Sequence, residues 1–163
     1  MLLVLVLLSM FFPAVLFPAH GAGDIRPLDL YFSYSPGQAY EYLVALGVEG
    51  RSAYIGMALT SDLVFPVVYA LALSAALVLV LRKLLPLSSR LRYLCLFPFL
   101  IVIADWCENL CLAMVARAFP ERADALVRSA SLFTSLKWMF IALTILMLLT
   151  AVTCWVVRAM RGR

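Results

Sequence analysis

Long runs of apolar residues dominate the chain, and polar residues fall in short segments between them. The runs lie at residues 1–19, 53–81, 93–116 and 129–157. Each run is long enough to cross a hydrocarbon core about 30 Å thick, which takes about 20 largely apolar residues in a helix. Because lipid offers no water to bond open backbone groups, each run must be helical. The pattern predicts an all-α fold, a membrane four-helix bundle that forms a single domain over residues 1–163.

The first run admits two interpretations. It ends at the small residues Ala19 and Gly21, on either side of His20, as a cleaved signal peptide would. No basic residue precedes the run, and Pro13 and Pro18 lie inside it, which favours an uncleaved anchor instead. Both interpretations leave the later spans with the same direction.

Basic residues predict that direction. The segment after the second run and the C-terminal tail contain no acid, and their basic residues are Arg82, Lys83, Arg90, Arg92, Arg158, Arg161 and Arg163. Lysine and arginine near the ends of spans stay on the cytoplasmic side. The outer segment, residues 20–52, carries more acids than bases. We therefore expect a multi-pass protein of the cell membrane with both termini in the cytoplasm.

Composition excludes several classes of protein. Hydrophobic residues make up 66% of the chain and charged residues 13%, against about 45–50% and about 25% in soluble domains. So few polar side chains cannot cover a water-exposed surface, which excludes a cytosolic enzyme, a secreted disulfide domain and a disordered chain. The formal net charge of +4 comes from clusters beside apolar runs, so membrane lipids, and not nucleic acid, are the expected partners. Ala72 and Ala76 are small residues four positions apart, a spacing that permits close contact between helices. The sequence is therefore compatible with a homo-oligomer.

The outer segment contains a predicted surface helix. Residues 28–33 alternate between apolar and polar, which is typical of a short extended stretch. Ser35, Pro36 and Gln38 then have the spacing of a helix start with a capping box, and Gly47 is placed to end the helix. This short interfacial helix is either a lid packed on the bundle or a gate for lateral entry of a lipid. Packing is the commoner role of such helices.

Four charged residues lie well inside the predicted spans: Asp62, Asp105, Glu108 and Lys137. A charge near the centre of a membrane helix costs about 2.5–3.5 kcal/mol on insertion scales, so such residues usually face the bundle interior and pair. At 1.5 Å per residue, all four lie about 12 to 16 Å from the outer ends of their spans. We expect them to meet in the outer half of the bilayer. The three carboxylates exceed the one ammonium by two charges, which a shared proton, a bound cation or a loop arginine such as Arg51 would offset.

Uncharged residues on the same helical faces extend the candidate site. The predicted ligand-binding residues are Asp62, Tyr69, Asn109, Thr134 and Trp138. If the site is enzymatic, the predicted catalytic residues are Asp105, Glu108 and Lys137. The two acids would then share a proton for acid–base chemistry, and Lys137 would hold an anionic group.

Several short motifs recur together in one known group of proteins. They include Leu28-Asp29-Leu30, Glu49-Gly50-Arg51, the D-x-x-E-N motif at Asp105, Glu108 and Asn109, and Leu136-Lys137-Trp138. As a set, across residues 28–140, they resemble a widespread family of small uncharacterised four-helix integral membrane proteins. The resemblance implies four spans and a shared polar cluster, and it brings no known activity.

Three functional hypotheses follow. The first is a polar pocket in the outer half of the bilayer that binds a lipid or a lipid-like amphiphile. The second is a non-catalytic structural or interaction protein whose buried charges only lock helix packing, and the third is a lipid-modifying enzyme that uses the carboxylate pair. The four cysteines lie inside the spans, where a thiol acts as a small apolar group, so we expect no metal and no cofactor.

Overall fold

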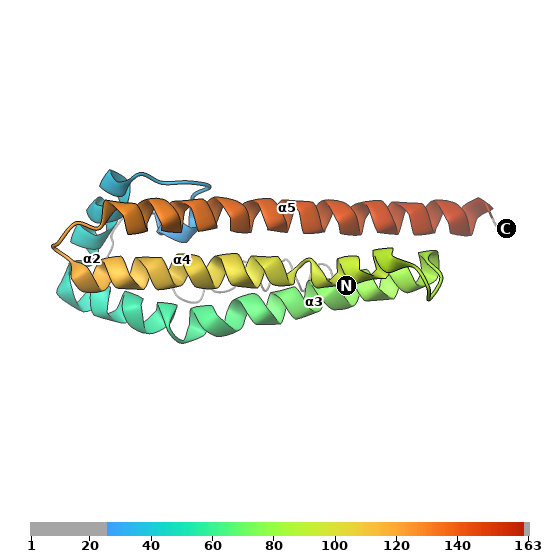
Figure 1. Ribbon diagram of the computed structural model, residues 1–163, viewed down its shortest axis with the longest axis horizontal. Coiled ribbons are helices and arrows are strands. Elements are labelled where there is room, and N and C mark those ends of the chain that lie inside the picture. Colours follow the sequence, from blue (N-terminus) through green and yellow to red (C-terminus); the bar gives the residue numbers. More distant parts are fainter. Residues whose placement is uncertain (1–25, 162–163) are drawn as a thin grey trace.

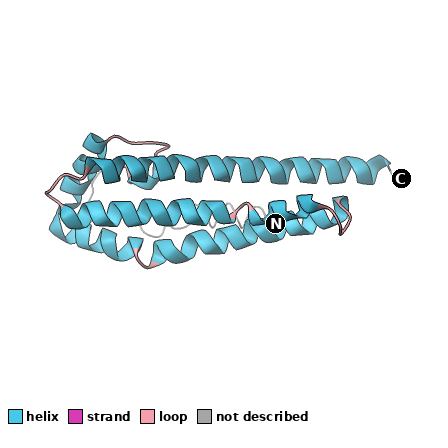
Figure 2. Ribbon diagram, viewed as in Figure 1, coloured by secondary structure: helices cyan, strands magenta, loops and turns pink. Residues whose placement is uncertain are grey.

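A computed structural model describes residues 26–161, and this part of the chain is helical without a strand (Figure 2). The elements in order are η1 (Leu28–Leu30), α2 (Pro36–Ala58), α3 (Ser61–Leu84), η2 (Arg90–Leu96), α4 (Phe99–Ala118) and α5 (Asp124–Arg161). Three runs are long and apolar enough to cross a membrane, Pro36–Leu84, Arg90–Ala118 and Asp124–Arg161. They indicate a membrane protein. The predicted first span, residues 1–19, lies outside the described residues.

The long helices α3, α4 and α5 run side by side, and each contacts the other two (Figure 1). The first half of α2 lies at the end of the molecule where α4 turns into α5 (Figure 1). There the backbone N–H of Ala123 donates to the Tyr40 hydroxyl at 2.6 Å, which fixes α2 to that turn.

The predicted start of the surface helix is present in α2. Ser35 and Gln38 form a reciprocal capping box, and Pro36 occupies the first turn. Gly47 has φ 66° and breaks the helix as predicted, but the chain resumes its helical path at once and continues to Ala58. This backbone conformation is open to glycine and costly for other residues.

The prediction of one helix over residues 53–81 is wrong. The chain leaves helical geometry at Leu59 and Thr60, and α3 begins only at Ser61. The hydroxyl of Thr60 donates to the Gly56 carbonyl oxygen at 2.7 Å, and that of Ser61 donates to the Met57 carbonyl oxygen at 3.2 Å. These side chains bond the last carbonyls of α2 in place of backbone N–H groups, as hydroxyl residues often do at helix ends.

Three other predicted boundaries differ from the structure. The α-helix predicted from residue 93 begins at Phe99, because Pro98 has no N–H to donate and the preceding turn is a 3-10 helix. Helix α5 is one continuous helix, as predicted for 129–157, but it extends from Asp124 to Arg161. The extended stretch predicted for 28–33 is wrong at its start, where η1 forms a 3-10 turn.

Candidate functional site

An ion-paired cluster joins α4 to α5. The Lys137 Nζ atom lies 3.0 Å from Asp105 Oδ1 and 2.6 Å from Glu108 Oε2. Asp105 and Glu108 share one face of α4 because they are three residues apart. Their exposed fractions are 8% and 0%, and that of Lys137 is 6%. We call these three residues the charge cluster.

Two uncharged residues predicted for the site lie against the charge cluster. Asn109 Nδ2 donates to Asp105 Oδ2 at 3.1 Å. Thr134 is fully buried one turn before Lys137, and its hydroxyl donates to the Ala130 carbonyl oxygen at 2.9 Å. Asp105 therefore has a partner at each oxygen, whereas Glu108 Oε1 is buried without a hydrogen-bond partner in the described part of the chain.

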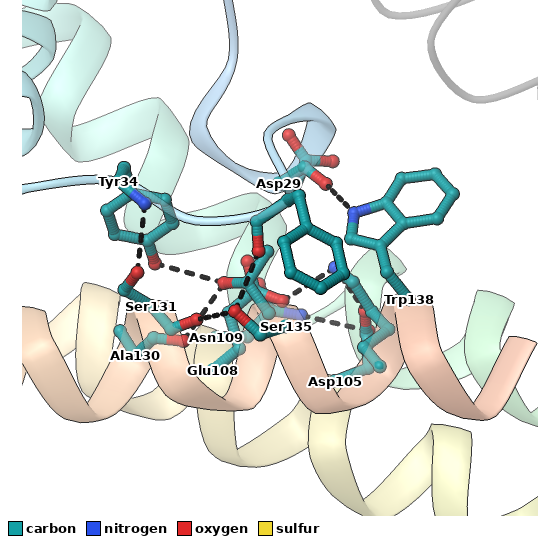
Figure 3. Close-up of polar contacts among 12 residues, drawn as sticks. Asp29, Tyr34, Asp105, Glu108, Asn109, Ala130, Ser131, Ser135 and Trp138 are labelled. Atoms are coloured by element: carbon teal, nitrogen blue, oxygen red, sulfur yellow. Dashed lines mark hydrogen bonds and ion pairs between the residues drawn. The ribbon is translucent and has the colours of Figure 1, made fainter.

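Residues 28–35, which we call the strap, lie along α5 beside the charge cluster (Figure 3). Ser131 Oγ accepts from the Tyr34 backbone N–H at 2.9 Å, and Ser135 Oγ donates to the Phe32 carbonyl oxygen at 2.8 Å. Trp138 Nε1 donates to the Asp29 carbonyl oxygen at 3.2 Å. Side chains of α5 thus hold the strap through its backbone.

Tyr34 is a side chain of the strap that lies close to the charge cluster (Figure 3). Its ring is buried, and its hydroxyl lies 3.3 Å from the Thr134 hydroxyl. Burial raises the pKa of Tyr34 above its ordinary value, and the nearby charge of Glu108 raises it further. The neutral phenol is therefore the form that fits the site.

Sequence reasoning did not predict the strap as part of the site. A signal was present, because Ser131, Thr134, Ser135 and Trp138 follow one another on one flank of α5. Such a polar flank on an otherwise apolar helix needs hydrogen-bond partners. The sequence does not say which distant segment supplies them.

Apolar residues pack on both sides of the charge cluster along the helices. Toward the strap end, Leu112 belongs to a core with α2, and toward the other end Ile101 and Ile141 pack with Leu73 of α3. Tyr69 and Trp138, both predicted as ligand-binding residues, pack against this second core. The cluster is a thin polar layer between two apolar layers.

Asp62 does not join the charge cluster, contrary to the prediction that all four charges meet. It lies in the first turn of α3 and accepts a hydrogen bond from Ser61 at 3.2 Å. An acid in a first turn interacts favourably with the helix dipole and needs no distant lysine.

Arg51 does not reach the charge cluster either. It donates to the Leu43 carbonyl oxygen at 2.9 Å, across the break at Gly47, and its guanidinium carbon lies 4.3 Å from the centre of the Phe119 ring. Because Asp62 and Arg51 are both engaged elsewhere, the cluster has two carboxylates and one ammonium, an excess of one negative charge if all are ionised.

Within residues 26–161, no three His, Cys, Asp or Glu side chains gather closely enough to hold a metal ion. The charge cluster offers two ion-paired acids and one unpartnered carboxylate oxygen, which is an acceptor for a hydrogen-bond donor. Comparison of the chain with protein-family models, curated proteins and solved structures gives no match.

Proposed function

We propose that this is a multi-pass protein of the cell membrane that binds a lipid or lipid-like amphiphile at the charge cluster. In this proposal residues 1–19 supply a fourth span, and the site lies in the outer half of the bilayer. The group bound is a hydrogen-bond donor, such as the hydroxyl or ammonium group of a lipid headgroup, because the free atom of the site is an acceptor.

Exposed apolar residues beyond the charge cluster support its proposed position in the outer half of the bilayer. Leu110 and Met114 of α4 and Leu132 of α5 are exposed, and they continue the apolar surface toward the strap end. At the other end the basic residues begin at Arg82 and Arg158. A lipid-facing belt between these limits puts the cluster nearer the strap end, which faces outward if the basic end is cytoplasmic.

One observation carries the binding proposal: among the described residues, the buried Glu108 Oε1 has no hydrogen bond of good geometry, and the nearby Thr134 hydroxyl donates to the Ala130 carbonyl oxygen instead. A buried acceptor that finds no donor costs about 1–3 kcal/mol, and more when it is charged. A cluster that served packing alone would be more stable with one acid fewer. The unpaired oxygen and the excess acid are therefore features that a bound donor group would satisfy.

In the proposal, movement of the strap opens a route to this atom. The strap is held to α5 by the few hydrogen bonds described above, and Phe32 of the strap is 65% exposed. In the proposal the strap moves away from α5 to admit the headgroup while the acyl chains stay in the bilayer. This movement would make the outer segment a gate for the lateral entry of a lipid, in addition to a lid packed on the bundle.

Native mass spectrometry of protein extracted gently from its membrane tests the proposal. We expect a retained amphiphile in the unmodified protein and its loss in Glu108→Gln, with no fall in melting temperature, because glutamine keeps the shape of the side chain. The control is Glu121→Gln, an exposed glutamate in the turn between α4 and α5, which should retain the amphiphile. An equal amount of ligand in both variants, or none in the unmodified protein, would contradict the proposal.

A purely structural role is the second candidate, and the two short contacts of Lys137 favour it. Each contact joins α5 to α4, so the cluster fixes the register of the two helices. The enzymatic hypothesis has less support, because the ammonium that would hold an anionic group already contacts both acids. The catalytic roles of Asp105, Glu108 and Lys137 stay predictions.

A further inference from the structure

The end of the molecule opposite the strap has two adjoining depressions. The first is a polar cleft of about 390 Å³ lined by Leu87, Ser88, Ser89, Arg90, Arg92 and Tyr93. The second is an open apolar groove of about 430 Å³ that runs along η2 to Leu100 and shares Arg90 and Tyr93 with the cleft. The two together make one continuous surface that is polar at the end of the molecule and apolar along its side.

The polar cleft has the charge of an anion site. Arg90 and Arg92 line it, and residues 82–92 contain no acid. Arg92 donates through Nη2 to the Leu85 carbonyl oxygen at 2.8 Å, whereas its Nε atom is buried without a hydrogen-bond partner in the described residues. The bond to Leu85 holds the guanidinium at the edge of the cleft, and a guanidinium is suited to a phosphate oxygen.

The apolar groove has the surface of an acyl-chain site. Leu91, Leu94 and Leu96 line it and are exposed, and Phe97 and Leu100 continue it along η2 and into α4. A free inorganic anion would make no use of this groove. An amphiphile whose charged head and apolar chain are joined fits both depressions at once.

We propose that the cleft and the groove bind one anionic phospholipid from the leaflet at the basic end. Its phosphate lies at Arg90 and Arg92, with Ser88 and Ser89 as further hydrogen-bond donors, and one acyl chain follows the groove past Leu94. Basic pockets at the cytoplasmic ends of membrane helices commonly bind anionic headgroups. This site is separate from the charge cluster, so its existence does not depend on the function proposed above.

The test is a lipid titration of the full chain in detergent, followed by native mass spectrometry. The probes are phosphatidylglycerol, phosphatidylcholine with the same acyl chains, and glycerol phosphate. We expect phosphatidylglycerol to bind more tightly than phosphatidylcholine, and glycerol phosphate at the same concentration not to displace it. Equal binding of the two lipids, or displacement by glycerol phosphate, would overturn the proposal.

Two pairs of variants locate the site. Arg90→Gln should weaken phosphatidylglycerol binding about five-fold, as expected for the loss of one basic residue at a membrane surface. Arg82→Gln removes the same charge outside the cleft and should change binding by less than about two-fold. An equal effect of the two variants would show diffuse attraction and contradict a site.

Leu94→Ser tests the groove, with Leu79→Ser as its control because Leu79 is also an exposed leucine, on α3 and outside the groove. Only Leu94→Ser should weaken binding of the long-chain lipid. Neither position is buried in the core, so both variants should keep the melting temperature of the unmodified protein. If both serine variants bind the lipid equally well, no acyl chain occupies the groove.

Discussion

Lys137 is the single positive charge between two buried carboxylates, so its removal should be costly. In Lys137→Met, Asp105 and Glu108 remain buried with no counter-charge. Breaking a buried pair in this way typically costs about 3–5 kcal/mol. We expect a large fall in melting temperature in detergent, measured by a thermal unfolding assay.

Lys83→Met is the matched control for this prediction. Lys83 is exposed at the opposite end of the molecule, where its Nζ atom lies 4.7 Å from the centre of the Trp155 ring. Its loss should cost no more than about 1 kcal/mol. Adding Glu108→Gln to Lys137→Met should recover part of the lost stability, because one unpaired acid is removed. Equal melting temperatures for the two methionine variants would mean that the cluster contributes no stability.

The burial of Tyr34 predicts that the free energy of unfolding declines at alkaline pH. Burial raises its pKa, so the folded protein favours the neutral phenol more than the unfolded chain does. This contribution to stability is complete below pH 10 and declines as the pH rises above 10, by about 1.4 kcal/mol per pH unit at most. Between pH 9 and pH 11 the unmodified protein should therefore lose about 1.4 kcal/mol more than Tyr34→Phe. Unfolding at the two pH values measures this, and parallel losses in both proteins would show that Tyr34 is not buried.

At the scale of elements, the two halves of α2 depend on Gly47. Its backbone conformation costs about 1–3 kcal/mol for a residue with a side chain, so Gly47→Ala should destabilise the protein by about that amount. Gly56 lies inside the second half of α2, and a methyl group there would also meet nothing within 4 Å. Gly56→Ala should be neutral or stabilising by up to about 1 kcal/mol. Because neither methyl group clashes, the contrast in melting temperature isolates the backbone effect, and equal effects would contradict the break at Gly47.

The same elements show which features the sequence can predict. The capping box of α2 and the break at Gly47 depend on residues close in the chain, so local spacing predicts them. The buried faces of α4 and α5 also follow from helical periodicity, which placed Asp105, Glu108 and Lys137 on facing surfaces. Each of these features follows from the spacing of residues within a single helix.

The features that sequence reasoning missed involve contacts between distant segments or a break in a uniform run. The depth assigned to Asp62 assumed one helix over 53–81, and the break at Leu59 and Thr60 puts this residue at the start of α3 instead. The strap is held by hydrogen bonds to residues about one hundred positions away along the chain, such as that between Tyr34 and Ser131. No local pattern specifies such a pairing.

At the scale of the whole molecule, the two ends differ in charge and in construction. The strap end carries mixed charges on α2 and on the turn between α4 and α5, including an exposed pair between Arg122 and Asp124. Among residues 26–161, the charged residues at the opposite end are all basic, and Arg158 of α5 donates to the Leu84 carbonyl oxygen at 3.0 Å, which joins α5 to the end of α3. For spans that lie across a membrane, this difference in charge predicts that the basic end faces the cytoplasm.

This orientation predicts which loops a membrane-impermeant thiol reagent reaches in intact cells. Ser88→Cys lies in the exposed loop at the basic end, and Glu121→Cys lies in the turn at the strap end. Glu121→Cys should be labelled in intact cells, whereas Ser88→Cys should be labelled only after the membrane is made permeable. The unmodified chain is the control, because its cysteines at 95, 107, 111 and 154 lie within the apolar runs and should react little. The reverse labelling pattern would invert the orientation and put the charge cluster in the inner half of the bilayer, while labelling of both loops in intact cells would contradict a membrane crossing between them.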